Sequence, residues 1–203
     1  MGYFLAFSVV LIAFILAVPT LFGDYMAFQL SLTYLYAIVA VGVGLCWGQG
    51  GFLPLGQGMF LGLGAYISGS VLINLSGSVA LWLMLPIAAL APAVLAYIIG
   101  LAAFRGRTES GPYFTLITLA LTLLAFQIAN TWNEVTGGFN GMRTIPDLPG
   151  MDGFVSRYYF AATALLLVLG VAAWLINAPL GVVWRALTQN ERRIVFFGTL
   201  QLN

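Results

Sequence analysis

Long runs without ionised side chains, separated by short polar or glycine-rich segments, make up most of the chain. Each run is close to the roughly 20 residues that a helix needs to cross a hydrocarbon core about 30 Å thick. The runs are rich in Leu, Ala, Ile and Val and do not alternate between apolar and polar positions, so helices fit them and a β-barrel does not. We therefore predict an all-α fold, a polytopic transmembrane bundle of about six spans: residues 3–22, 25–47, 57–73, 79–104, 112–130 and 158–178.

The composition excludes most catalytic chemistry. Of 203 residues, 62% are apolar and 6% are charged, whereas a soluble domain has roughly a quarter charged residues. The absence of lysine and histidine removes a phosphate-binding Walker A loop, a histidine base and an imidazole metal site. The lone Cys46 cannot form an internal disulfide, and a net charge of +1 does not favour nucleic-acid binding. We expect no catalytic residue, no metal and no cofactor.

Arginine positions predict the orientation of the bundle. Arginines follow the fourth and the sixth spans, which end on the same side of the membrane: Arg105, Arg107, Arg185, Arg192 and Arg193. Because Lys and Arg concentrate in cytoplasmic loops, that side is predicted to be cytoplasmic. The N-terminus is then cytoplasmic, and the loop 131–157 is external. The first apolar run lacks a basic segment and a cleavage signal, so we expect it to be a retained span.

A glycine-rich segment with Pro54 separates the second and third spans. Residues 48–58 cannot be ordinary helix interior, and irregular backbone at membrane depth survives only where protein or a watery cavity satisfies it. The small residues that follow form two pairs at helical spacing, which would let helices approach closely: Gly58 with Gly62, and Ala65 with Gly69. Tight helix packing and a direct part in a solute path are both compatible with this segment.

A stripe of threonines marks the fifth span. Thr115, Thr118 and Thr122 are spaced to share one helix face. Hydroxyls in such a stripe either bond within the helix and its neighbours or line a path, and the sequence leaves both open. With the polar Gln57 and Asn140, these threonines are the candidate lining residues of a translocation path.

The last segment is too charged to span. We predict that residues 1–178 form the membrane domain and that residues 179–203 lie on the cytoplasmic face. A short helix is expected over 190–198, because Asn190 is a good N-cap, Glu191 suits the positive helix end, and Gly198 suits a left-handed stop. It is either an interfacial linker or a docking helix for a cytoplasmic partner.

Four motifs, in order, resemble those of ABC permeases for branched-chain amino acids and urea. Residues 46–66 are similar to the family's W-G-x-x-G-x-L-S-L-G-(H/Q)-G signature, with Pro54 in place of serine. Residues 105–118 resemble R-x-x-G-x-Y-F-x-I-x-T, and residues 136–142 resemble T-G-G-x-N-G. Residues 185–198 resemble the family's cytoplasmic coupling loop, which includes Asn190, Glu191, Arg192, Arg193 and Gly198.

The resemblance implies an ATP-driven importer in the inner membrane. Its partners would be a homologous permease subunit, two cytoplasmic ATPases, an extracytoplasmic solute-binding protein and membrane lipid. The solute would be small and neutral, such as a branched-chain or other neutral amino acid, urea or a short amide. Because chains of the family continue with further spans, the sequence is expected to be truncated relative to them.

Three other interpretations are alternatives to an ABC permease. An ion-coupled secondary transporter usually carries acids or histidine inside its spans, and none occurs here. A degenerate or truncated permease would act only as an assembly subunit. A membrane enzyme is disfavoured, because no acid–base pair is visible within the spans. Co-purification of an ATPase would distinguish an ABC permease from a carrier.

Overall fold

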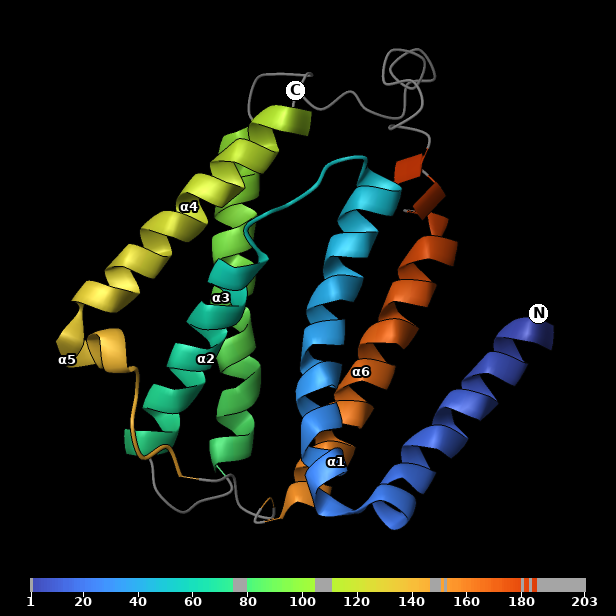
Figure 1. The fold of residues 1–203 in the computed structure, drawn as a ribbon. Coiled ribbons are helices and arrows are strands. Elements are labelled where there is room, and N and C mark those ends of the chain that lie inside the picture. The colour runs from blue at the N-terminus through green and yellow to red at the C-terminus, as the bar shows by residue number, and fades with distance from the viewer. Residues whose placement is uncertain are drawn as a thin grey trace. The chain divides into compact units, whose positions relative to one another are not determined.

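The described part of the chain is built from helices, with no strand (Figure 1). The computed structural model describes residues 2–74, 80–104, 111–146, 151, 153–179, 181–182 and 184–185. The elements in chain order are α1 (Gly2–Gly50), α2 (Gln57–Asn74), α3 (Ala80–Phe104), α4 (Gly111–Thr131), α5 (Asn133–Thr136), η1 (Gly138–Asn140) and α6 (Phe154–Asn177). The predicted all-α fold is confirmed.

The long helices coincide with the predicted spans. Helix α1 covers the first two, α2, α3 and α4 cover the next three, and α6 covers the last. Within the described residues, three helical stretches are long and apolar enough to cross a membrane by themselves, with a shorter apolar stretch over Pro86–Ala102. The long ones are Phe14–Gly50, Tyr113–Thr131 and Phe154–Asn177.

Helix α6 begins at Phe154, four residues before the predicted start at 158. The uncharged apolar run that predicts this span begins after the charge of Arg157. In the structure, the Arg157 Nε atom donates to the Met151 carbonyl at 3.2 Å, and its guanidinium lies 5.9 Å from the centre of the Phe154 ring. The charge therefore points back toward the helix start, and the helix can include it.

The chain divides into two compact units. The first contains Met1–Val41 and Gly150–Trp174. In it, α1 loses helical geometry at Gly23, where φ is 76° and ψ is −179°. Figure 1 shows that the chain reverses direction within α1. A left-handed φ costs little only for glycine, so the predicted division between the first two spans falls at this position.

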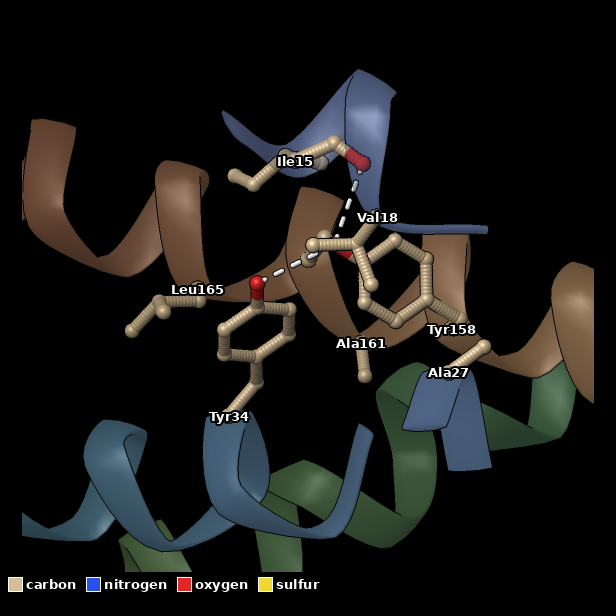
Figure 2. Packing of buried hydrophobic residues seen from close by; sticks show 8 residues of the cluster. Ile15, Val18, Ala27, Tyr34, Tyr158, Ala161 and Leu165 are labelled. Atoms are coloured by element: carbon tan, nitrogen blue, oxygen red, sulfur yellow. Dashed lines mark hydrogen bonds between the residues drawn. The ribbon is translucent and has the colours of Figure 1, made fainter. Parts of the chain in front are cut away.

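A buried tyrosine pair lies at the centre of the first unit (Figure 2). The Tyr158 hydroxyl donates to the Ile15 carbonyl at 3.0 Å. Because that uses its only proton, Tyr34 must be the donor in the 3.1 Å bond between the two tyrosine hydroxyls. The apolar side chains packed in the same cluster include Val18, Ala27, Ala161, Ala162 and Leu165.

Pro19 explains why Tyr158 is needed. In a helix, the Ile15 carbonyl would accept from the amide of residue 19, but proline has no N–H. The Tyr158 side chain is fully buried and supplies the missing donor from α6. Burying an unsatisfied carbonyl in an apolar setting lowers stability by up to several kcal/mol. The Tyr158 hydroxyl therefore stabilises α1 at its bend by bonding the Ile15 carbonyl.

The second unit contains Gly42–Pro149 and the chain from Leu175 onward. Its helix α2 packs along α3 and also contacts α4. A Cβ at Gly64 would lie 3.5 Å from the Pro92 ring and 3.9 Å from the Ala88 carbonyl. Pro92 removes the amide that would otherwise bond that carbonyl, and the small Gly64 lets α2 come close there.

We predict that Tyr158→Phe lowers the stability of the protein in detergent by about 1–2 kcal/mol, because the Ile15 carbonyl and the Tyr34 hydroxyl both lose a partner. Thermal unfolding would measure the loss. Tyr159→Phe, on the same helix, is the matched control and should change little. In a Pro19→Ala background the amide returns, so Tyr158→Phe should cost clearly less. An equal loss in both backgrounds would contradict the compensation.

Candidate functional site

The candidate site is the non-helical segment between α1 and α2, together with the face of α4 that holds it. Gly51 has a φ of 70° and its amide donates to the Trp47 carbonyl at 3.2 Å, which ends α1 in a left-handed cap. Helix α2 starts at Gln57, and the Met59 amide bonds the Gly56 carbonyl at 3.1 Å. Residues 51–56 lie between these caps and outside both helices, and are hereafter called the break (Figure 1).

The threonine stripe of α4 bonds the backbone of the break. The Thr115 hydroxyl donates to the Leu53 carbonyl at 2.7 Å, and the Leu55 amide donates to the Thr118 hydroxyl at 3.1 Å. The Thr122 hydroxyl lies 3.5 Å from the Leu55 carbonyl. Because these threonines share one helix face, a single surface of α4 satisfies the irregular backbone.

The same hydroxyls also bond within α4. Thr118 donates to the Thr115 carbonyl at 3.0 Å, and Thr122 donates to the Thr118 carbonyl at 2.8 Å. A hydroxyl has one proton, so Thr122 is committed to its own helix and its contact with Leu55 at 3.5 Å is secondary. Thr118 uses both its donor and an acceptor position, and only 2% of its surface is exposed.

The break lies at membrane depth. Thr118 and Thr122 are seven and eleven residues into α4, which places them roughly 10 and 16 Å from its start at 1.5 Å per residue. Since Leu55 contacts both threonines, the break reaches the middle of a helix long enough to cross the membrane. Helix α2 has 18 residues, so it covers only part of the distance by itself.

Close packing fixes the break against α4. Gly56 is buried, and a Cβ there would lie 3.1 Å from the Thr118 Cβ atom and 3.4 Å from its carbonyl oxygen. The rings of Phe52 and Phe114 meet edge to face, with centres 5.0 Å apart. Pro54 is also buried and brings no amide that would need a partner. The break therefore has one defined backbone path along α4.

Gly56 is one of several glycines in residues 48–58, and no local pattern in the sequence marks which of them lies against another helix. The sequence therefore did not distinguish Gly56 from its neighbours. The spacing of the threonines did reveal their common face. What the spacing could not provide was the identity of their partner, which is the backbone of the break.

The other predicted lining residues lie apart from the stripe along the chain. Gln57 is the first residue of α2 and is partly buried. Asn140 is exposed at the end of η1, after α5. Gln57 directly follows Gly56, which lies against Thr118, so it adjoins the break, whereas Asn140 belongs to the separate turn after α4.

The predicted small-residue pairs have different neighbours. A Cβ at Gly58 would lie 3.8 Å from the Thr122 methyl group, whereas one at Gly62 would meet open space. Ala65 is exposed. Gly69 is buried, and a Cβ there would lie 2.9 Å from the Met142 sulfur, so its neighbour is the segment after η1 and not a helix.

The T-G-G-x-N-G motif forms a tight turn that follows α4. The Thr136 hydroxyl lies 2.5 Å from the Ala129 carbonyl and 2.8 Å from the Trp132 carbonyl, and the Gly138 amide donates to it at 3.1 Å. The three glycines of the motif have left-handed φ values: 77° at Gly137, 61° at Gly138 and 68° at Gly141. Thr136 was not singled out as a site residue because its partner, Ala129, belongs to the preceding helix.

Two further predicted features concern charge and metal binding. Arg185 donates to the carbonyls of Gly181 and Ile176 at 3.2 and 3.1 Å, which places a cation at the negative end of α6. In the part of the chain that the structure describes, no group of histidine, cysteine or acidic residues could hold a metal ion. The residues predicted to couple to an ATPase, Asn190, Glu191, Arg192, Arg193 and Gly198, lie outside the described residues.

The family model and the relatives that match this chain are all permease components of transport systems. Residues 25–200 match the family described as the permease component of branched-chain amino acid transport systems. The high-affinity branched-chain amino acid transport system permease protein LivM of Escherichia coli K12 is 28% identical over 188 residues, and its counterpart in Salmonella typhimurium LT2 is 27% identical. Each alignment covers 79% of this chain and 43% of the relative, so the chain spans less than half of their length. No solved structure matches.

We predict that Thr118→Val destabilises the fold by about 1–3 kcal/mol, because the shape is kept while the Leu55 amide loses its acceptor at membrane depth. Thr118→Ser should retain most of the stability. Thr163→Val is the matched control, because the exposed Thr163 hydroxyl bonds only the Tyr159 carbonyl of its own helix. Thermal unfolding in detergent would rank the three variants. Equal losses for Thr118→Val and Thr163→Val would show that the bond to the break is unimportant.

Proposed function

This chain belongs to the family of permease components of branched-chain amino acid transport systems, and from that premise we propose that it is a membrane-spanning subunit of an ATP-driven importer. It would lie in the inner membrane with its N-terminus in the cytoplasm. Its proposed partners are a homologous permease subunit, two cytoplasmic ATP-binding subunits and an extracytoplasmic solute-binding protein. The ATP-binding subunits would carry out the nucleotide chemistry, so this chain needs no phosphate-binding lysine, and its sequence contains none.

The break supports a solute path through this subunit. Irregular backbone at membrane depth is tolerated where protein satisfies it or where it lines a water-filled cavity. Helices broken at the midplane are a recurrent device of transport proteins, because they offer uncharged hydrogen-bonding groups inside the bilayer. We propose that Thr115, Thr118 and Thr122 shape the path by holding the break, and that Gln57 and Asn140 contribute amide groups at other points along it.

The face of α2 that carries Gly62 supports the contact with the second permease subunit. Gly62 has open space around it and Ala65 is exposed, so neither position has a packing partner among the described residues. Small residues let helix backbones approach closely in a bilayer. In the proposed assembly, the partner permease packs against Gly62 and Ala65, while Gly58 and Gly69 pack within this chain.

The proposed solute is small and neutral. No acidic or basic residue lies in the interior of the predicted spans, so the path offers hydroxyl, amide and backbone groups but no fixed charge. A zwitterionic amino acid or an uncharged amide fits such a path better than an ion does. The relatives are described as branched-chain amino acid transporters, which makes a branched-chain amino acid the first solute to test and urea the second.

Proteoliposomes that contain the complex purified through this chain would test the proposal. With its solute-binding protein present, we expect uptake of radiolabelled leucine that requires ATP, stops with vanadate and continues when an ionophore collapses ion gradients. Uptake that needs the ion gradient and no ATP would replace the importer by a secondary transporter. Uptake of urea and not leucine would keep the importer and change the solute.

We predict that residues 190–198 couple this subunit to the ATPase. Glu191→Arg removes a favourable interaction of roughly 0.3–1 kcal/mol with the expected helix dipole, and Gly198→Val opposes a left-handed stop more strongly. Both variants should insert normally, while solute-stimulated ATP hydrolysis falls, more for Gly198→Val. Thr188→Ser, in the same segment but outside the expected helix, is the control. Full stimulation with Gly198→Val would mean that the segment is only a linker.

A further inference from the structure

The turn after α4 exposes more apolar surface than its size would suggest. Phe139 is 89% exposed, and two other apolar side chains of the turn, Trp132 and Val135, are 53% and 45% exposed. In water, such residues would each keep an unfavourable apolar surface. Nothing in the proposed solute path requires a phenylalanine at this position.

The turn holds Phe139 rigidly. The Thr136 hydroxyl contacts the carbonyls of Ala129 and Trp132 and accepts from the Gly138 amide, and the Gly141 amide donates to the Gly138 carbonyl at 3.0 Å. A Cβ at Gly137 would collide with the Gly141 carbonyl, and one at Gly138 with the Asn133 side chain. The backbone beside Phe139 is therefore internally bonded, as irregular backbone near a bilayer must be.

Two contacts place this turn at the depth of a membrane boundary. The contact between Thr136 and Ala129 folds the turn back against the last turn of α4, a helix of 21 residues and roughly 31 Å, about the thickness of the hydrocarbon core. Just beyond the turn, Met142 packs at Gly69, and α2 continues from there to Asn74, roughly 7 Å further. In Figure 1, α5 lies short of the level that the end of α2 reaches.

We propose that the turn 132–141 is an interfacial lipid anchor, in which Phe139, Trp132 and Val135 contact the boundary between lipid headgroups and acyl chains. Aromatic side chains concentrate at this boundary, and apolar surface is stabilised there. These side chains contact lipid and not a soluble protein, because α2 extends further toward the membrane surface than the turn does. The turn therefore does not project out of the bilayer. The anchor would fix the height of α4, whose threonines hold the break. The inference depends on membrane insertion and not on the solute or the energy source.

Site-specific fluorescence would test the anchor in the complete complex. In a Cys46→Ala background, Phe139→Cys is labelled with an environment-sensitive fluorophore and placed in phosphatidylcholine vesicles with nitroxides either near the headgroup or near the acyl-chain end. We expect the nitroxide near the headgroup to quench several-fold more than the deep nitroxide or aqueous iodide. Phe126→Cys, at an exposed position inside α4, is the control and should be quenched most by the deeper nitroxide.

Two results would overturn the anchor. Quenching of the Phe139→Cys label by iodide alone would place the Phe139 side chain in water, facing a soluble partner or the solute path that Asn140 is proposed to line. Lipid quenching that is present for this chain alone and lost on assembly with the second permease subunit would make the turn a protein interface. Since neither result depends on uptake or ATP hydrolysis, failure of the anchor and failure of the importer can be told apart.

Discussion

Satisfying backbone hydrogen bonds away from water is the constraint on which this structure depends. At three of the places where the described chain leaves regular helix, a hydroxyl side chain bonds a backbone group that helix geometry leaves without its usual partner. Tyr158 bonds the Ile15 carbonyl that Pro19 leaves open, Thr115 and Thr118 bond the break, and Thr136 bonds the turn after α4. A hydroxyl both donates and accepts, and it carries no charge that would be costly to bury. Hydroxyls therefore allow irregular backbone without ionised groups in the spans.

These hydroxyls also define which backbone path is stable. Thr118 both donates and accepts, with its proton on the Thr115 carbonyl and its oxygen accepting from the Leu55 amide. Individual side-chain hydrogen bonds in membranes average only about 0.6 kcal/mol, because the alternatives also find partners. Each bond is therefore worth little by itself, and the position of the break depends on several of them together with the close packing at Gly56.

Proline and glycine have complementary roles in this arrangement. Pro19, Pro54 and Pro92 each remove a donor, and glycines are found where another chain segment must come close. Gly56 lies against Thr118, and Gly64 lies near the carbonyl that Pro92 leaves open. Where the left-handed region is needed, at Gly23 and Gly51, the chain also uses glycine. The backbone path of the irregular segments is therefore determined by particular proline and glycine residues, as the path of the helices is determined by their apolar runs.

The sequence by itself determined the helices, their approximate ends and the positions of the breaks. These are local properties: a span is a run of apolar residues of sufficient length, and a glycine-rich segment with proline cannot be helix interior. The common face of Thr115, Thr118 and Thr122 also followed, because helical spacing fixes it. The start of α6 was placed too late, because the direction of the Arg157 side chain depends on its contact with Met151.

Only the tertiary structure decided which groups satisfy the breaks. Tyr158 and Ile15 are 143 residues apart, and Thr118 and Leu55 are 63 apart, so no local pattern relates them. Among the glycines of residues 48–58, the buried Gly56 became distinguishable only when α4 was in place beside it. Hydrophobic length dictates where a chain enters and leaves the membrane, but a hydrogen bond requires two atoms within about 3 Å. That proximity is a property of helix packing, which the sequence pattern of a single helix does not contain.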